Sequence, residues 1–214
     1  MSQRNSLAGT VKKTNRLAWL CILLFPYGCG AAGQVNAGRQ ALIVNKPDVA
    51  LAYFQHAAET DPNYVMKVVA FDQGVWTYLG RAQYLVGKIP EARRSLERAV
   101  AQHPDDSLAG LYLGMALARD NDRSRGLQQI ESAMKRIYDR IELVVNNKIG
   151  TGEFWDPRGE MRSEIQNNLA MIAGREIDWQ KLISSGEWLG QQMEEEVEKA
   201  QSDKQGDIES GGSG

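Results

Sequence analysis

The chain has 214 residues, of which 43% are apolar and 24% are charged, a composition that fits one globular domain and excludes collagen-like and wholly disordered chains. Residues 1–33 carry four basic side chains and no acidic one, so residues 34–214 have a net charge of −6, which argues against nucleic-acid binding. Both cysteines lie in the first 30 residues and only two histidines are present, so we expect neither a metal site nor a disulfide framework.

Residues 1–33 have the three-part layout of an export signal. A basic segment ends at Arg16, an apolar run covers 17–25, and small residues follow Pro26. The apolar stretch reaches 17 residues and is interrupted by proline and glycine, whereas a spanning helix needs about 20 apolar residues. We therefore expect a signal peptide or a lipoprotein leader at 1–33.

Cys29 follows a small residue and precedes Gly-Ala-Ala, which resembles the lipobox of bacterial lipoproteins. The resemblance implies lipidation of Cys29. Plain cleavage near 31–33, an uncleaved anchor and a buried cytosolic helix are the alternatives. Lipidation, cleavage and an uncleaved anchor all imply export, so we expect a membrane-associated protein of the bacterial envelope that faces the periplasm and touches the membrane through its leader or lipid alone.

A pattern of small and apolar residues recurs with a period of 34 residues in the middle of the chain. A further copy lies 42 residues before the middle one, which is one period plus an insertion of eight at 65–72. The recurring residues are Gly38, Ala50, Phe54, Ala57 and Pro62 in the first copy, Trp76, Leu79, Gly80, Ala92, Leu96, Ala99 and Pro104 in the second, and Leu113, Gly114, Gly126, Ile130 and Ala133 in the third.

Each copy is predicted to be a helix-turn-helix unit. Gly80 and Ala92 allow two helices to approach closely, Leu96 fills the space between them, and Pro104 ends the pair. In the insertion we expect the first helix of the second copy to begin early, with a short separate helix broken near Asp72 as the alternative. In both accounts an apolar strip of Tyr64, Val68 and Phe71 packs on a neighbouring helix or serves as a docking patch.

Residues 141–200 are predicted to form a helical cap. Asp156 as N-cap with Pro157 at the first helical position predicts a helix ending near 173. A short helix is expected over 177–182, followed by a capping box of Ser184 and Glu187 and a last helix ending near 201. Its polar face, with Glu194, Glu195 and Glu198, is typical of a terminal cap, and the Gly/Ser-rich residues 201–214 are expected to be disordered.

The 34-residue spacing resembles that of the tetratricopeptide repeat (TPR), over copies at about 31–64, 73–106 and 107–140, within a repeat domain at 34–140. The resemblance implies an all-α, right-handed superhelix whose concave groove is lined by the first helix of each pair. Carried over to this sequence, the groove positions are Val35, Arg39, Leu42, Thr77, Arg81, Tyr84, Leu111, Met115 and Arg119. The Lys and Asn set of chaperone-binding TPR proteins is absent from these positions.

We find no catalytic or phosphate-binding constellation in the sequence, because His56 and His103 are expected at surface positions in or just after second helices of repeats and the Gly-rich residues 150–153 lack the lysine of a P-loop. We therefore expect a non-catalytic adaptor without cofactor or metal, which binds a segment of another envelope protein. The groove arginines favour an acidic segment. The alternatives are an enzyme or small-ligand binder that uses Trp155, Trp179 and Trp188, and a structural subunit that binds through its convex face or the 64–71 strip.

Overall fold

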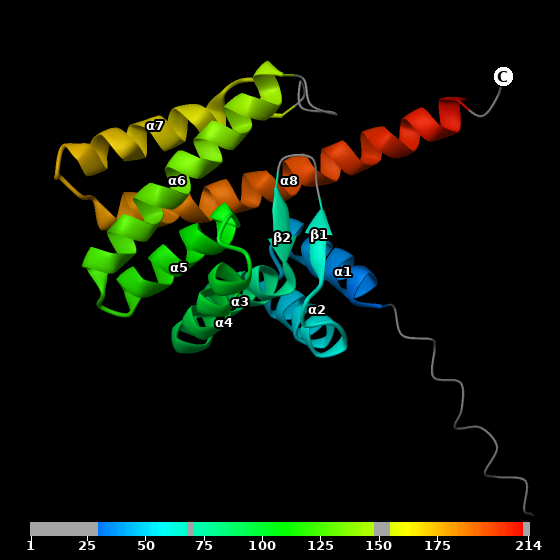
Figure 1. Ribbon diagram of the computed structural model, residues 1–214, viewed down its shortest axis with the longest axis horizontal. Coiled ribbons are helices and arrows are strands. Elements are labelled where there is room, and N and C mark those ends of the chain that lie inside the picture. Colours follow the sequence, from blue (N-terminus) through cyan, green and yellow to red (C-terminus); the bar gives the residue numbers. More distant parts are fainter. Residues whose placement is uncertain (1–29, 68–70, 148–154, 212–214) are drawn as a thin grey trace, which may run out of the picture.

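The computed structural model describes residues 30–67, 71–147 and 155–211 (Figure 1). Residues 1–29 of the expected leader, including Cys29, lie outside the described residues, as does Val68 of the apolar strip, whereas residues 31–33 form the first turn of a helix. The described residues form helices apart from one short hairpin, so the all-α prediction is confirmed. Among the described helices, none combines the length and the apolar content that crossing a bilayer requires.

Six helices form three consecutive helix-turn-helix pairs. Within each pair the two helices pack on each other, α2 also packs on α3 and α4 on α5, and α3 lies against both α1 and α5. The pairs are α1 (Ala31–Ile43) with α2 (Pro47–Thr60), α3 (Val75–Leu85) with α4 (Ile89–Gln102), and α5 (Ser107–Arg119) with α6 (Arg123–Asn146).

The same small-residue contact closes every pair. A glycine in the first helix lies under a large apolar side chain of the second, and a Cβ atom at Gly80 would stand 2.5 Å from Leu96 Cγ. The three contacts are Gly38 on Phe54, Gly80 on Leu96, and Gly114 on Ile130. The predicted close approach of the paired helices through small residues is therefore confirmed.

The insertion forms a hairpin, so both helical accounts of it are wrong. Strand β1 (Val65–Lys67) pairs antiparallel with β2 (Asp72–Gly74), with Val65 opposite Gly74. β1 begins with Val65, a β-branched residue that favours extended backbone. Phe71 is buried, with its ring 5.7 Å from that of Trp155, so it offers no exposed docking patch.

Helix α7 (Glu160–Ala173) begins three residues later than predicted. Pro157 lies in the preceding turn, where Asp156 and Gly159 have positive φ angles. The N-cap residue is Gly159, so the predicted N-cap position and the predicted start of the helix are both wrong. Asp156 still stabilises the first turn, because its carboxylate accepts hydrogen bonds from the backbone N–H groups of Met161 (2.9 Å) and Arg162 (3.2 Å).

Helix α8 (Trp179–Gly211) is continuous, so the predicted break and capping box at 184–187 are wrong. Asp178 accepts the backbone N–H of Lys181 at 3.0 Å, and Ser184 Oγ donates to the Lys181 carbonyl at 3.0 Å within the helix. The backbone stays helical to Gly211 where a disordered tail was expected. Figure 1 shows α8 crossing the array lengthwise, and it packs on α1, α5 and α7 rather than stacking on one end.

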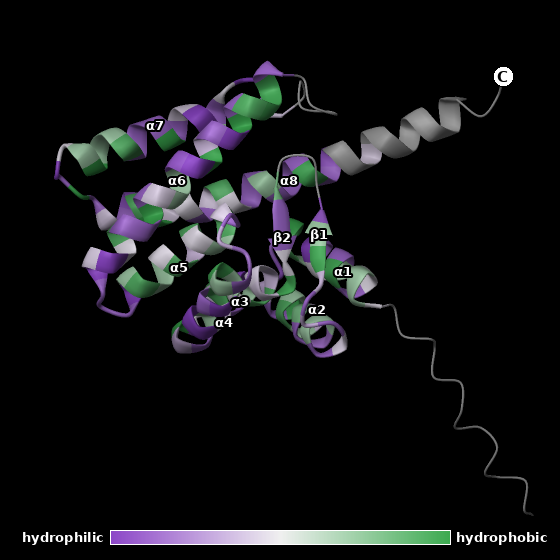
Figure 2. Cartoon of the chain, viewed as in Figure 1, coloured by the Kyte–Doolittle hydropathy of each residue, from purple (hydrophilic) through white to green (hydrophobic). Residues whose placement is uncertain are grey.

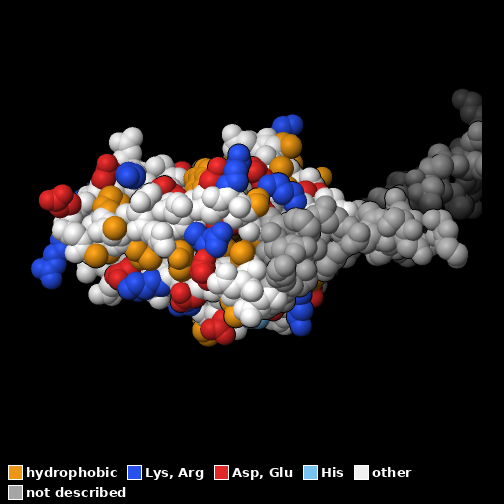
Figure 3. All heavy atoms as spheres, turned by 90° about the horizontal axis from the view of Figure 1, so that it is seen from above, with side chains coloured by type: hydrophobic (Ala, Val, Ile, Leu, Met, Phe, Trp, Pro, Cys, Tyr) orange, Lys and Arg blue, Asp and Glu red, His pale blue; other side chains and the backbone are white. Residues whose placement is uncertain are grey.

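Hydrophilic and hydrophobic residues alternate around α6, α7 and the part of α8 that crosses the array (Figure 2). Helix α5, by contrast, is buried from Ser107 to Leu117 because helices surround it. One face of the molecule, seen in Figure 3, shows charges of both signs among scattered apolar side chains. The interior of the fold therefore lies around α5, between the helix pairs and α8.

Candidate functional site

Helix α8 occupies the predicted groove. Eight of the nine predicted groove residues are buried, and Arg119 is the exposed one. The six that contact α8 are Arg39, Arg81, Tyr84, Leu111, Met115 and Arg119. Val35 and Leu42 are buried in the same core, and Thr77 instead donates a hydrogen bond to Asp106 at 2.6 Å. The structure thus brings most of the predicted site together around a helix of the same chain.

Two groove arginines hold one carboxylate of α8, and we call this group the buried triad (Arg39, Arg81 and Glu194). Arg39 Nε lies 2.7 Å from Glu194 Oε2, while Arg81 Nη1 pairs with the other carboxylate oxygen. Arg81 Nη2 also donates to the Gly190 carbonyl at 3.1 Å, and its guanidinium lies 5.1 Å from the centre of the Tyr112 ring. The side chain of Glu194 is fully buried, so the expectation that it lies on a polar outer face is wrong.

A second acidic residue of α8, Glu187, lies at the edge of the groove. Its Oε1 accepts a hydrogen bond from Tyr84 Oη at 3.0 Å and pairs with Arg119 Nη2 at 2.9 Å. The Arg119 guanidinium also lies over the Tyr84 ring, 4.4 Å from its centre. Glu187 and Glu194 are seven residues apart, which places both on one face of the helix.

Two glycines let α8 approach the groove closely. A Cβ atom at Gly186 would stand 2.5 Å from Met115 Sδ, and one at Gly190 would overlap Tyr112 Oη. Sequence reasoning missed this role of α8. A signal was present, because three arginines were predicted to face the groove, an arginine that becomes buried requires a carboxylate partner, and α8 is rich in acidic residues.

Part of the groove stays open beside α8. A cavity of about 330 Å³ lies between the C-terminal ends of α1 and α3 and the α8 residues Glu187 and Gln191. Leu85 lines it and is partly exposed. This cavity is where a bound molecule would meet both the groove and α8.

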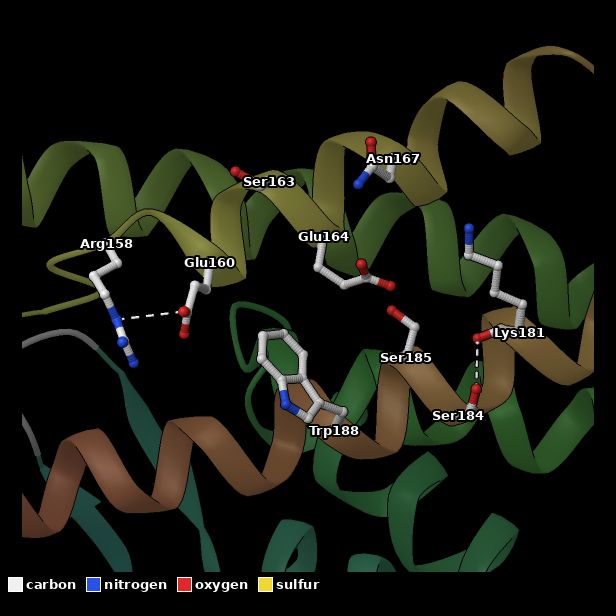
Figure 4. A pocket seen from close by; sticks show the side chains of 9 residues that line it. All are labelled: Arg158, Glu160, Ser163, Glu164, Asn167, Lys181, Ser184, Ser185 and Trp188. Carbon is white, nitrogen blue, oxygen red and sulfur yellow. Dashed lines mark hydrogen bonds and ion pairs between the residues drawn. The ribbon is translucent and has the colours of Figure 1, made fainter.

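The structure separates the three C-terminal tryptophans instead of gathering them into one pocket. Trp155 is buried against Phe71, and the Trp179 ring lies 5.3 Å from the Arg123 guanidinium. Trp188 lines a different cleft, between α7 and α8 (Figure 4). Among the described residues, the three rings therefore do not line one common pocket, as the alternative of a binder that uses all three would require.

No group of three potential metal-ligating side chains occurs within the residues that the structure describes. Asp106 is a buried carboxyl group at the N-terminus of α5. Burial raises its pKa, although it accepts hydrogen bonds from Thr77, Ala109 and Gly74. Its contacts cap α5 and tie it to α3, which is a structural role.

The folded protein is expected to become less stable at alkaline pH because of its buried tyrosines. Burial raises the pKa of Tyr78, Tyr84 and Tyr112 above the ordinary value. Above a pH of about 10 the unfolded chain releases these protons and the folded chain keeps them, so the free energy of unfolding should fall by up to about 1.4 kcal/mol per pH unit for each tyrosine.

Urea unfolding between pH 8 and pH 11 measures this loss of stability. The variant Tyr84→Phe, which cannot ionise, should show a smaller decline than the unmodified chain. An equal decline in both proteins would contradict the assignment to Tyr84.

Comparison with models of known protein families gives no match, and comparison with curated protein sequences gives none either.

Proposed function

We propose that this protein is a non-catalytic scaffold of three TPR-like repeats in the bacterial envelope, and that its concave groove binds an acidic helix of a partner protein in competition with α8. The 34-residue period and the repeated glycine contact support the TPR-like superhelix. The export-type composition of residues 1–33 supports the envelope location.

One observation carries the proposal: the groove already holds an acidic helix. Side chains from α1, α3 and α5 converge on two carboxylates two helical turns apart. Glycines at 186 and 190 admit the helix backbone between them. The ligand that fits is thus a helix with acidic residues seven apart and small residues on the same face.

Competition with α8 determines how high the local concentration of the partner must be. A tethered helix has an effective concentration in the millimolar range, so a free partner at lower concentration binds only weakly. A partner held to the same membrane gains local concentration and reduces that disadvantage. Release would begin at the Glu187 end, where both side chains of the ion pair are partly exposed, rather than at the fully buried Glu194.

A photo-crosslinking residue at position 85 tests the proposal in native membranes. The change Glu187→Lys removes the acceptor of Tyr84 and Arg119 from α8 and leaves the groove intact, so we expect more crosslinked partner. The change Arg119→Glu alters the groove itself and should reduce capture. Mass spectrometry of the crosslinked peptide should show an acidic helical segment.

Glu195→Lys is the matched control, because Glu195 is on the same helix and accepts hydrogen bonds from Gln191 and Gln192 of that helix. It should leave capture unchanged. Equal capture by Glu187→Lys and Glu195→Lys, or a captured segment without acidic residues, would contradict the proposal.

A further inference from the structure

A cleft between α7 and α8 is lined by polar side chains where packed helices normally present apolar ones. Its volume is about 520 Å³, within the range of ligand pockets of about 300–1,000 Å³. Each helix contributes one face at positions i, i+3, i+4 and i+7. These faces are Glu160, Ser163, Glu164 and Asn167 on α7, and Lys181, Ser184, Ser185 and Trp188 on α8, with Arg158 at one end (Figure 4).

Polar residues at these helical intervals are unusual between two facing helices. Two facing helices usually bury apolar residues at these intervals, because the free energy of packing comes from removing apolar surface from water. Here Trp188 is the single large apolar side chain of the eight. Helix α7 places its apolar residues Met161, Ile165 and Ile172 in the protein core and keeps a second, polar face toward α8.

The floor of the cleft is fixed by hydrogen bonds. Asn168 Nδ2 donates to Ser185 Oγ at 2.6 Å and to Glu164 Oε1 at 3.1 Å, which joins the two helices below the cleft. Asn168 is fully buried and Ser185 nearly so. The cleft is therefore a feature of how the two helices are joined.

The charges of the lining cancel. Arg158 and Lys181 oppose Glu160 and Glu164, and Arg158 Nε already lies 3.3 Å from Glu160 Oε1. A strongly anionic or cationic ligand would meet as much repulsion as attraction. A neutral ligand rich in hydroxyl groups suits the set, because each hydroxyl both donates and accepts hydrogen bonds.

We propose that this cleft binds an uncharged saccharide, with one sugar ring against Trp188 and its hydroxyl groups hydrogen-bonded to the polar faces of α7 and α8. The apolar C–H face of a sugar ring matches the indole, which offers a large apolar surface with a polar edge. The site is independent of the groove, since it lies on the side of α8 that faces α7.

Titration of the ¹⁵N-labelled full chain with cellobiose, maltose and N,N′-diacetylchitobiose tests the proposal. The indole N–H signal of Trp188, identified by its loss in Trp188→Phe, should shift with at least one of these disaccharides. Trp188→Ala should raise the Kd at least about tenfold. Ser163→Trp should do the same by filling the mouth of the cleft, and its fold is expected to be intact because Ser163 is exposed.

Trp179→Phe is the matched control, because Trp179 is on the same helix outside the cleft; it should leave the Kd unchanged. Lysine amide and inorganic phosphate serve as charged probes. The proposal is overturned if no disaccharide shifts the Trp188 signal, if Ser163→Trp binds as the unmodified chain does, or if a charged probe binds more tightly than every disaccharide.

Discussion

Replacing Glu194 with alanine is expected to lower the free energy of unfolding by about 3–5 kcal/mol, because it leaves two buried arginines without their carboxylate. Arg39 and Arg81 are each about 1% exposed, so water cannot replace the lost partner without opening the fold. Urea unfolding followed by circular dichroism measures the change. Glu195→Ala, on the same helix but half-buried, should change the free energy of unfolding by no more than about 0.5 kcal/mol.

Replacing the whole triad separates the cost of an unpaired charge from the value of the ion pairs. The triple variant Arg39→Met, Arg81→Met, Glu194→Met should be more stable than Glu194→Met alone, since it buries no uncompensated charge. If the single variant were the more stable of the two, the arginines would be reaching solvent, and α8 would not enclose them.

The second large effect is expected at Gly114 in α5. A Cβ atom there would stand 2.8 Å from both the Gly126 carbonyl oxygen and the Ile130 backbone nitrogen, and backbone cannot move aside as a side chain can. Gly114→Ala should therefore lower the free energy of unfolding by about 2–3 kcal/mol, although alanine favours helix by about 1 kcal/mol. Thermal and urea unfolding both report this change.

Gly110, one turn earlier in α5, provides the matched control. A Cβ atom at Gly110 would meet the Nη2 atom of Arg136 at 3.0 Å, which is the end of a flexible side chain. Gly110→Ala should leave stability unchanged or raise it by up to about 1 kcal/mol. Equal destabilisation by both variants would mean that the α5–α6 contact does not depend on the Gly114 position.

The helix pairs were predictable because their packing depends on residues that recur at fixed intervals. Gly80 and Leu96 have counterparts in every copy, and the glycine contact is the same in each. Pro47 and Pro90 lie in the first turn of the second helix of their pairs, where proline is compatible with helical backbone. The recurring glycine and large apolar residue were thus enough to predict how the two helices of each pair pack.

The hairpin and the position of α8 were not predictable by the same means. Residues 65–74 occur once, so no second copy constrains them, and their pairing depends on Tyr78 donating to Met66 Sδ at 3.3 Å and on Phe71 meeting Trp155. The role of Glu194 depends on Arg39, which is 155 residues away in the chain. Sequence periodicity carries no information on contacts of that range.

The contact between α1 and α8, which joins residues far apart in the sequence, affects how the molecule should unfold. A stacked repeat array is quasi-one-dimensional, so each unit contacts only its neighbours and the array can melt from either end. Here the last helix of the chain is bonded to the first described one through Arg39 and Glu194, and to α3 and α5 on the way. Neither end of the array can fray while these contacts hold, so we expect the repeats to unfold together once α8 has been released, rather than repeat by repeat.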